Sequence, residues 1–187
     1  MIGKKNVVFG FLFLVLTAAL GPYMIIEHVP GVGAAQAAKQ ESVGRLQSLQ
    51  ADGFEENLEP LTAEAIAKAN TAGILALNKL ANAQQPVDII KGGPHAHGNL
   101  ESLLNIAIGI SLGFIAISTL FKQIISWIFI LGTILHSGIL YLIALFQLEW
   151  AATVLNTGAG PALILLGLLL AGIAAAIGFN SELVKDH

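Results

Sequence analysis

Two histidines stand one residue apart in the segment GGPHAHGNLESLLN, where a long apolar run begins. Pro94 is a favoured first residue of a helix, so His95 and His97 are predicted to lie in its first turn. His97, Glu101 and Asn105 are spaced four residues apart and therefore share one face of that helix. Imidazole and carboxylate groups together suit zinc, copper, iron or nickel. This face is therefore a candidate metal or haem site.

The composition is that of a membrane protein. Of the 187 residues, 55% are hydrophobic and 11% are charged, whereas soluble domains carry about 25% charged residues. Four apolar runs have about the 20 residues that a helix needs to cross a bilayer; they cover 7–26, 99–121, 124–146 and 161–179. The net charge of −3, with no cluster of Lys and Arg, argues against nucleic acid as a partner. The lack of cysteine excludes disulfides and thiolate chemistry.

These runs predict an all-α fold: a polytopic membrane protein with four transmembrane helices and an extracytoplasmic helical insert. The first transmembrane helix is expected within 1–26, the extracytoplasmic helical loop within 27–93, and a three-helix transmembrane region with a short cytoplasmic tail within 94–187. Lysines that flank membrane spans are enriched on the cytoplasmic side. If the four helices alternate in direction, the lysines that lie together on one side of the membrane are Lys4, Lys5, Lys122 and Lys185. Both termini are therefore predicted to be cytoplasmic, in a bacterial-type inner membrane.

The loop between the first two spans is soluble in character. Apolar residues at helical spacing predict one helix over 34–50 and another over about 62–81, with Thr62 as the N-cap of the second. Two short amphipathic helices bury little core by themselves. We expect them to pack on each other, on the outer rim of the bundle or on a partner. The AQA at 35–37 resembles a signal-peptidase site, but the length of the first run and the gap before 35–37 favour a retained anchor.

Three separate stretches of the chain bring histidine or carboxylate groups to the predicted outer boundary of the membrane. His28 ends the first span, and Glu149 follows the third. With the residues of the second span, the candidate metal ligands are His28, His95, His97, Glu101 and Glu149. The alternative is that these groups only face water and lipid headgroups.

His136 lies within the third span and differs from the rim residues. It is about eleven residues from the outer end of that span, hence ~16 Å deep and near the bilayer centre. Gly132 beside it could admit a flat cofactor ring, whereas Thr133 or Ser137 could satisfy a buried neutral imidazole. The expected difference in height between His97 and His136 is at least ~10 Å, so these two rings are not expected to clamp one haem.

The fourth span is rich in small residues. Gly167, Ala171 and Ala175 are spaced four apart, and small residues at this spacing let helices approach closely in lipid. We expect packing within the bundle rather than a dimer face.

The start HAHGN of a membrane helix, followed by Gly109 and a short turn, resembles the histidine-bearing second helix of haem–copper oxidase subunit I. It is also similar to small multi-span proteins with a HAH-x-N helix start. The resemblance covers about 94–140 and implies that His95 or His97 ligates a low-spin haem. The chain departs from the oxidase pattern because the later helices with the other haem and copper histidines have no counterpart, and ESLLN replaces the Trp or Gly that often follows the motif.

Three classes of function follow, and none includes an assigned reaction. The first is a redox protein that binds haem b or a transition metal, with His95, His97 and His136 as cofactor ligands. The second is a non-catalytic subunit or assembly factor of a larger membrane complex, or a homo-oligomer, contacting its partner through 27–93. The third is a small transporter, ranked last because the spans lack the paired broken helices of transporter repeats. No nucleophile elbow, phosphate loop or HExxH motif occurs.

Overall fold

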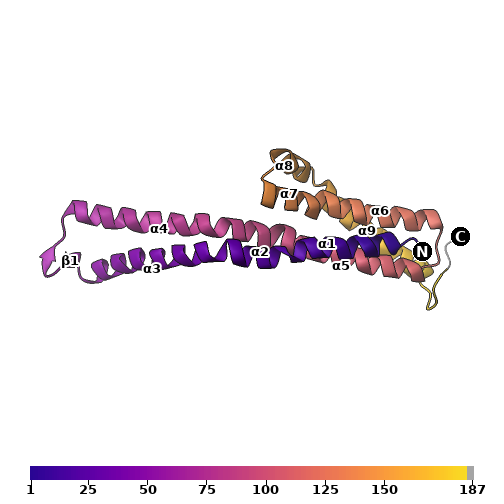
Figure 1. The fold of residues 1–187 in the computed structure, drawn as a ribbon, viewed down its shortest axis with the longest axis horizontal. Helices are drawn as coiled ribbons and strands as arrows, with labels where there is room; N and C mark the ends of the chain where they lie inside the picture. Colours follow the sequence, from indigo (N-terminus) through magenta and orange to yellow (C-terminus); the bar gives the residue numbers. More distant parts are fainter. Residues whose placement is uncertain (185–187) are drawn as a thin grey trace. The chain divides into compact units, whose positions relative to one another are not determined.

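The computed structural model describes residues 1–184, and most of them are helical. The chain forms two compact units. One comprises Met1–Gly21 together with the chain from Ile89 onward, and the other comprises Pro22–Asp88. The first unit holds the helices labelled α1 and α5 to α9 in Figure 1. Lys185, one of the lysines behind the predicted orientation, lies outside the described residues.

Three helical segments are long and apolar enough to cross a membrane. They are Lys4–Glu27, Thr119–Phe146 and Ala159–Gly178, and they correspond to the predicted first, third and fourth spans. Large apolar side chains on their outer surfaces are exposed, for example Val15 at 68% and Ile177 at 74%. Exposed apolar surface of this extent is typical of a protein embedded in lipid. The predicted class of multi-pass membrane protein is thus supported for three helices.

The predicted second span is a shorter helix than expected. Helix α5 covers Ala96–Ser111, one tight turn continues to Phe114, and α6 begins at Thr119. With 16 residues, α5 is about 24 Å long, below the ~30 Å of a hydrocarbon core. The predicted end at 121 is wrong because Ser118 starts a new helix: its hydroxyl accepts a hydrogen bond from the Phe121 N–H at 3.3 Å.

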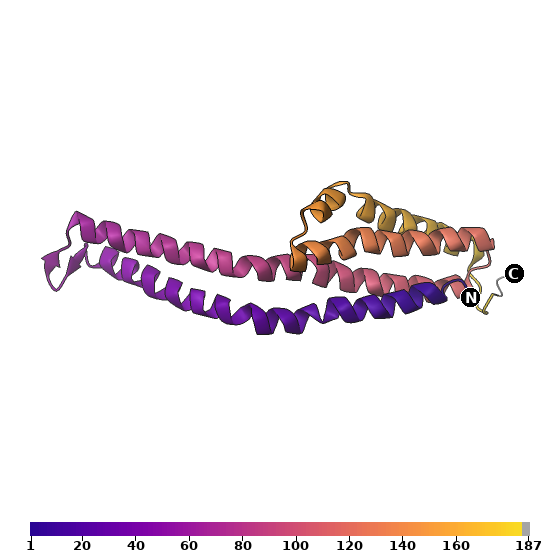
Figure 2. The ribbon, with the colours of Figure 1, turned by 45° about the horizontal axis from the view of Figure 1, so that its top comes forward.

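Close helix packing holds the first unit together. Helix α1 (Lys4–Ala18) lies along α5, and α6 (Thr119–Thr133) lies along α9 (Ala159–Gly178), as the two views of Figures 1 and 2 show. The α1–α5 contact requires glycine, because a Cβ at Gly98 would come within 2.3 Å of the Thr17 side chain. The buried apolar cluster comprises Leu112, Ile115, Ile125, Phe129, Ile164, Ala171 and Ala174.

The small residues of α9 pack inside the unit, as predicted. A Cβ on Gly167 would lie 3.0 Å from the Phe129 ring, and Ala171 belongs to the buried cluster. The start of this helix differs slightly from the prediction. It begins at Ala159 rather than Pro161, because Gly158 adopts a left-handed conformation (φ 68°) and lets the chain turn directly into the helix.

The third predicted span consists of two helices joined by a wider turn. Helix α6 leads into a π-helical turn at Ile134–Gly138, and α7 (Ile139–Phe146) follows. The short helix α8 (Glu149–Asn156) then connects α7 to α9. A π-turn contains one more residue than an α-turn and occurs often at functional sites. His136 lies within this turn.

The second unit is a helical hairpin. The boundary between the two units falls within α2 (Leu20–Glu27), after Gly21. Helix α3 (Val29–Ala51) follows, and α4 (Ala63–Ile90) runs back beside α3 (Figure 2). Thr62 caps α4, because its hydroxyl accepts a hydrogen bond from the Ala65 N–H at 3.2 Å; this confirms the predicted N-cap. Both long helices extend beyond the predicted 34–50 and 62–81.

The tip of this hairpin holds a two-stranded ribbon with an unusual turn. Strands β1 (Glu55–Glu56) and β2 (Glu59–Pro60) pair antiparallel. The two residues between them, Asn57 and Leu58, have left-handed φ angles of 57° and 66°. Such angles suit a tight hairpin turn, but they cost a branched residue such as leucine about 1–2 kcal/mol.

Candidate metal centre

The first unit brings His97 and His136 to the same level. Helices α5 and α6 run antiparallel on either side of the connection 115–118. His97 lies 18 residues before Ile115, and His136 lies 18 residues after Ser118, so the two histidines are equally far from the connection. Their ring centroids are 4.8 Å apart. The predicted height difference of at least ~10 Å is therefore wrong. The outer end of the third span is not level with the start of α5, because α6, the π-turn and α7 together run farther from the 115–118 connection than α5 does.

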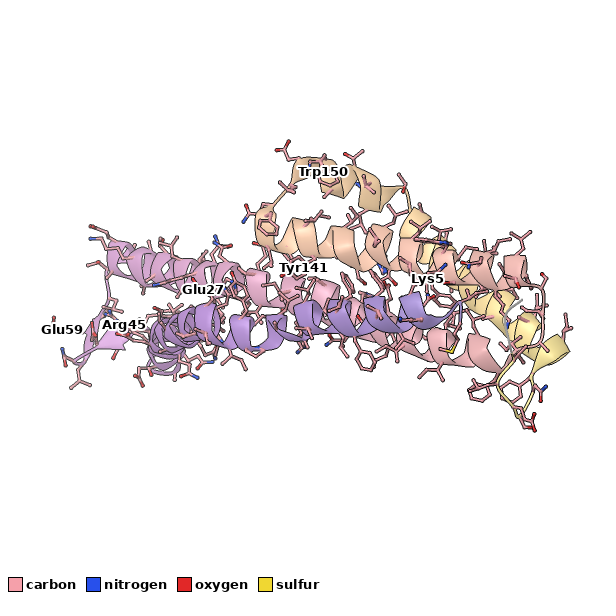
Figure 3. The ribbon with its side chains drawn as sticks, turned by 45° about the vertical axis from the view of Figure 1, so that its right-hand side comes forward. Lys5, Glu27, Arg45, Glu59, Tyr141 and Trp150 are labelled. Atoms are coloured by element: carbon pink, nitrogen blue, oxygen red, sulfur yellow. The ribbon has the colours of Figure 1, made fainter. Side chains whose placement is uncertain are left out.

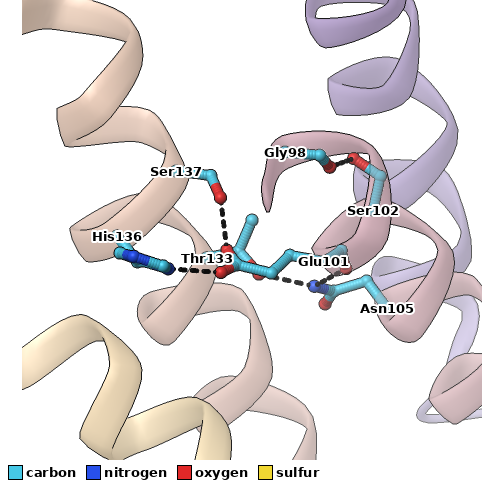
Figure 4. Close-up of polar contacts among 7 residues, drawn as sticks. All are labelled: Gly98, Glu101, Ser102, Asn105, Thr133, His136 and Ser137. Atoms are coloured by element: carbon cyan, nitrogen blue, oxygen red, sulfur yellow. Dashed lines mark hydrogen bonds and ion pairs between the residues drawn. The ribbon is translucent and has the colours of Figure 1, made fainter. Parts of the chain in front are cut away.

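Glu101 is the centre of the site. Its side chain is 5% exposed, and its two carboxylate oxygens have separate partners on the neighbouring helix. Oε1 lies 2.5 Å from Nδ1 of His136, and Oε2 accepts a hydrogen bond from the Ser137 hydroxyl at 2.7 Å (Figure 4). A carboxylate in an apolar setting is costly unless it is paired. These two contacts fix its position and orientation.

Two consecutive residues of the π-turn reach one carboxylate. His136 and Ser137 both lie in the wider turn at Ile134–Gly138, and both contact Glu101 on α5. Because a π-turn holds one more residue than an α-turn, its consecutive side chains diverge by somewhat less than the about 100° of a regular α-helix. Helix α9 supports the turn from behind, where a Cβ on Gly160 would lie 2.6 Å from the backbone nitrogen of His136.

His97 completes a group of three side chains that could ligate a metal ion. It lies one helical turn before Glu101 on α5, and its ring is exposed and tilted by 58° against the His136 ring. One ligand atom from each of His97, Glu101 and His136 lies within 4.8 Å of the other two. Ligands that bind one ion at about 2 Å lie within about 4 Å of one another.

A buried polar network continues from the site between the helices. The Asn105 amide donates to the Thr133 hydroxyl at 2.9 Å and to the Glu101 carbonyl at 3.0 Å. The Asn6 amide of α1 donates to Asn105 Oδ1 and to the Ser126 carbonyl, both at 3.0 Å. These residues are fully buried, apart from the slightly exposed Glu101. The network joins α1, α5 and α6, so it holds the helix that carries Glu101 against the helix that leads to His136.

The remaining predicted ligands lie apart from this group or in the other unit. His95 is half-buried and turned toward α1, where its Nδ1 lies 2.9 Å from the Thr17 carbonyl oxygen. Asn99 joins this contact by accepting a hydrogen bond from the Thr17 hydroxyl at 2.8 Å. Glu149 is exposed in the first turn of α8. His28 belongs to the second unit, where its ring meets Tyr23 edge-on.

Glu101 and His136 were both candidate site residues in the sequence, but the contact between them was not predicted. Thr133 and Ser137 were the predicted partners of a buried His136; instead Ser137 binds Glu101, and Thr133 binds Asn105. A signal was present in the sequence. In an antiparallel helix pair, residues equally distant from the connecting turn lie side by side, so counting outward from the Ser118 cap would have paired the two histidine levels.

Comparisons of the chain with protein-family models, with curated proteins and with solved structures found no match. The resemblance of HAHGN to the oxidase helix therefore stays a prediction, and the geometry of the site is the basis for a functional proposal.

Proposed function

We propose that this protein is a multi-pass membrane protein that binds one divalent transition-metal ion through His97, Glu101 and His136. The observation that supports this proposal is the convergence of two imidazoles and a buried carboxylate within 4.8 Å. The Ser137 hydroxyl donates a hydrogen bond to the second carboxylate oxygen of Glu101. In metal sites, such outer-shell hydrogen bonds orient the carboxylate that binds the ion. In lipid, ionisable side chains that face a helix bundle commonly serve function.

Two nitrogen donors and one oxygen donor favour zinc, copper, iron or nickel over magnesium or calcium. Three protein ligands leave a fourth tetrahedral position for water or a substrate, as in catalytic zinc sites. His97 is exposed, so that position can be reached from outside the helix bundle. The site therefore has the composition for redox chemistry with iron or copper, or for Lewis-acid chemistry with zinc.

The same geometry favours a bare metal ion over a haem held between these two rings. Axial haem ligands approach iron from opposite faces, so with bonds of about 2 Å their nitrogens are about 4 Å apart and the ring centroids about 6 Å apart. The centroids of His97 and His136 are closer, at 4.8 Å. Two imidazoles in neighbouring coordination positions of one metal ion match the 4.8 Å between the ring centroids better.

In the proposed membrane setting, α5 crosses together with the three long apolar helices, which gives four spans. Its buried face meets α1 and α6 rather than lipid. Lysines at the start of α1 favour a cytoplasmic N-terminus in a bacterial-type inner membrane. The metal site then lies toward the extracytoplasmic side, because His97 is at the end of α5 far from the 115–118 connection. The unit Pro22–Asp88 follows the first span on that same side.

A metal titration tests the proposal directly. Purified full-length protein is stripped with a chelator, and zinc binding is then measured by competition with a chromophoric chelator. We expect one ion per chain, with affinity reduced at least 100-fold in Glu101→Gln and in His136→Ala, since each removes a ligand. His95→Ala is the matched control: this histidine is only two residues from His97 but contacts Thr17, so its loss should leave the affinity unchanged. Folded wild-type protein that binds no ion would reject the proposal.

The alternative proposal is a non-catalytic subunit or assembly factor, or a homo-oligomer, that uses the second unit to bind its partner. The observation that favours it is a run of exposed apolar side chains on α4, with Ile74, Leu75 and Leu77 each exposed by 48–66%. Purification from the native membrane should then recover a stoichiometric complex. That complex should survive His97→Ala and be lost in Ile74→Asp. Loss of the biological function in His97→Ala with the complex intact would argue for the metal site instead.

A further inference from the structure

A groove of about 730 Å³ lies on the first unit, at the N-terminal end of α1 and far along the helices from the metal centre. Its lining changes character along its length. Lys4, Lys5 and Gln123 lie at one end together with Met1 and Ile2, and Val8, Phe9 and Leu12 continue along α1 one to two turns farther. A charged end followed by an apolar wall matches a molecule with a charged head and a hydrocarbon tail.

The charged end is organised by a second helix. The Lys5 ammonium group donates a hydrogen bond to Oε1 of Gln123 and lies 4.5 Å from the centre of the Trp127 ring, and both of these residues come from α6. Lys5 is marked on the ribbon in Figure 3. Gln123 and Trp127 are uncharged, so the described contacts of Lys5 leave its positive charge without compensation by a carboxylate. Lys4 beside it is exposed.

The apolar wall is part of a surface that faces lipid. Val8 and Leu12 are 48% and 65% exposed, and they belong to the candidate membrane span Lys4–Glu27. In the proposed membrane setting, the lysines stand at the depth of the phospholipid headgroups, and the wall stands at the depth of the acyl chains. Basic sites between membrane helices bind anionic headgroups, and each lysine near the membrane surface adds about a fivefold gain in affinity.

We propose that this groove is a binding site for an anionic phospholipid, with the phosphate at Lys4 and Lys5 and one acyl chain along Val8 and Leu12. Charge complementarity selects an anionic over a zwitterionic headgroup. The apolar wall selects a diacyl lipid over free phosphate. The proposal rests on the proposed membrane setting, but the site is separate from the metal centre, so it stands or fails independently of metal binding.

Lipid titration followed by native mass spectrometry tests the proposal. The full-length protein is delipidated in detergent and titrated in parallel with phosphatidylglycerol and phosphatidylcholine of the same acyl length. We expect one phosphatidylglycerol per chain to bind at least tenfold more tightly than phosphatidylcholine. Lys4→Gln should weaken this binding about fivefold. Because the described contacts of the groove involve Lys5 and not the Lys4 side chain, this variant should fold normally.

Two further variants separate charge from shape. Lys79→Gln, in the second unit, is the matched charge control and should bind phosphatidylglycerol like the wild type. Leu12→Trp fills the apolar wall without changing charge; it should weaken binding of the long-chain lipid and spare a short-chain phosphatidylglycerol. Equal affinity for the two headgroups, an unchanged affinity in Lys4→Gln, or full competition by millimolar inorganic phosphate would each overturn the proposal.

Discussion

Replacing Ser137 with alanine tests whether its hydroxyl, in the π-turn, supports the proposed metal site. The substitution removes the 2.7 Å hydrogen bond to Oε2 of Glu101 and leaves that buried oxygen without its described partner. A hydrogen bond to a charged group contributes about 1.5–3 kcal/mol, and the loss of an outer-shell partner lowers metal affinity about 10- to 100-fold. The two ranges agree, since about 1.4 kcal/mol corresponds to a tenfold change in affinity.

Ser102→Ala is the matched control. Ser102 is also fully buried and lies beside Glu101 in sequence, but its hydroxyl donates to the Gly98 carbonyl of its own helix at 2.6 Å. Its loss should cost about 1 kcal/mol of stability and leave metal affinity unchanged. The assay is zinc competition with a chromophoric chelator, with thermal melting in detergent to report stability. If both variants change zinc affinity equally, the proposed link between Ser137, Glu101 and the metal is refuted.

Three further predictions concern the stability of the fold. Gly160→Leu should destabilise the protein by at least about 3 kcal/mol in thermal melts, because its Cβ would lie 2.6 Å from the His136 backbone nitrogen, whereas Gly172→Leu, in open space, should have little effect. Leu58→Gly should stabilise the second unit by about 1 kcal/mol, because it relieves a left-handed φ of 66°; a lower melting temperature would contradict this. Asn6→Ala should cost about 2–3 kcal/mol, since it breaks three hydrogen bonds between helices, and unchanged melting would show that the network is dispensable.

The membrane class followed from composition because long apolar helices leave an unambiguous signal. The first, third and fourth predicted spans correspond to apolar helices of sufficient length. The second did not, because α5 carries Glu101 and Asn105 on its buried face and ends at a turn that the apolar pattern does not mark. Hydropathy alone cannot separate the end of a helix from an apolar loop such as 115–117.

The residue types of the candidate site were predictable from hydropathy and spacing, whereas the pairing of its residues depends on a helix register that only the Ser118 cap indicates in the sequence. The spacing of His97 and Glu101 placed them on one face of α5, and the structure keeps them there. The position of His136 depended on the register between two helices, which is set by the Ser118 cap and the π-turn rather than by hydrophobicity. His95 shares the HAH motif, yet its contact with the Thr17 carbonyl depends on how α1 packs, which the motif does not encode.

X-ray absorption spectroscopy of the zinc-loaded protein tests the central claim most directly. We expect a shell of nitrogen and oxygen ligands at about 2.0 Å, with outer scattering from two imidazoles in the wild type and from one in His97→Ala. A spectrum without imidazole scattering, or one that is the same in the wild type and in His97→Ala, would contradict it.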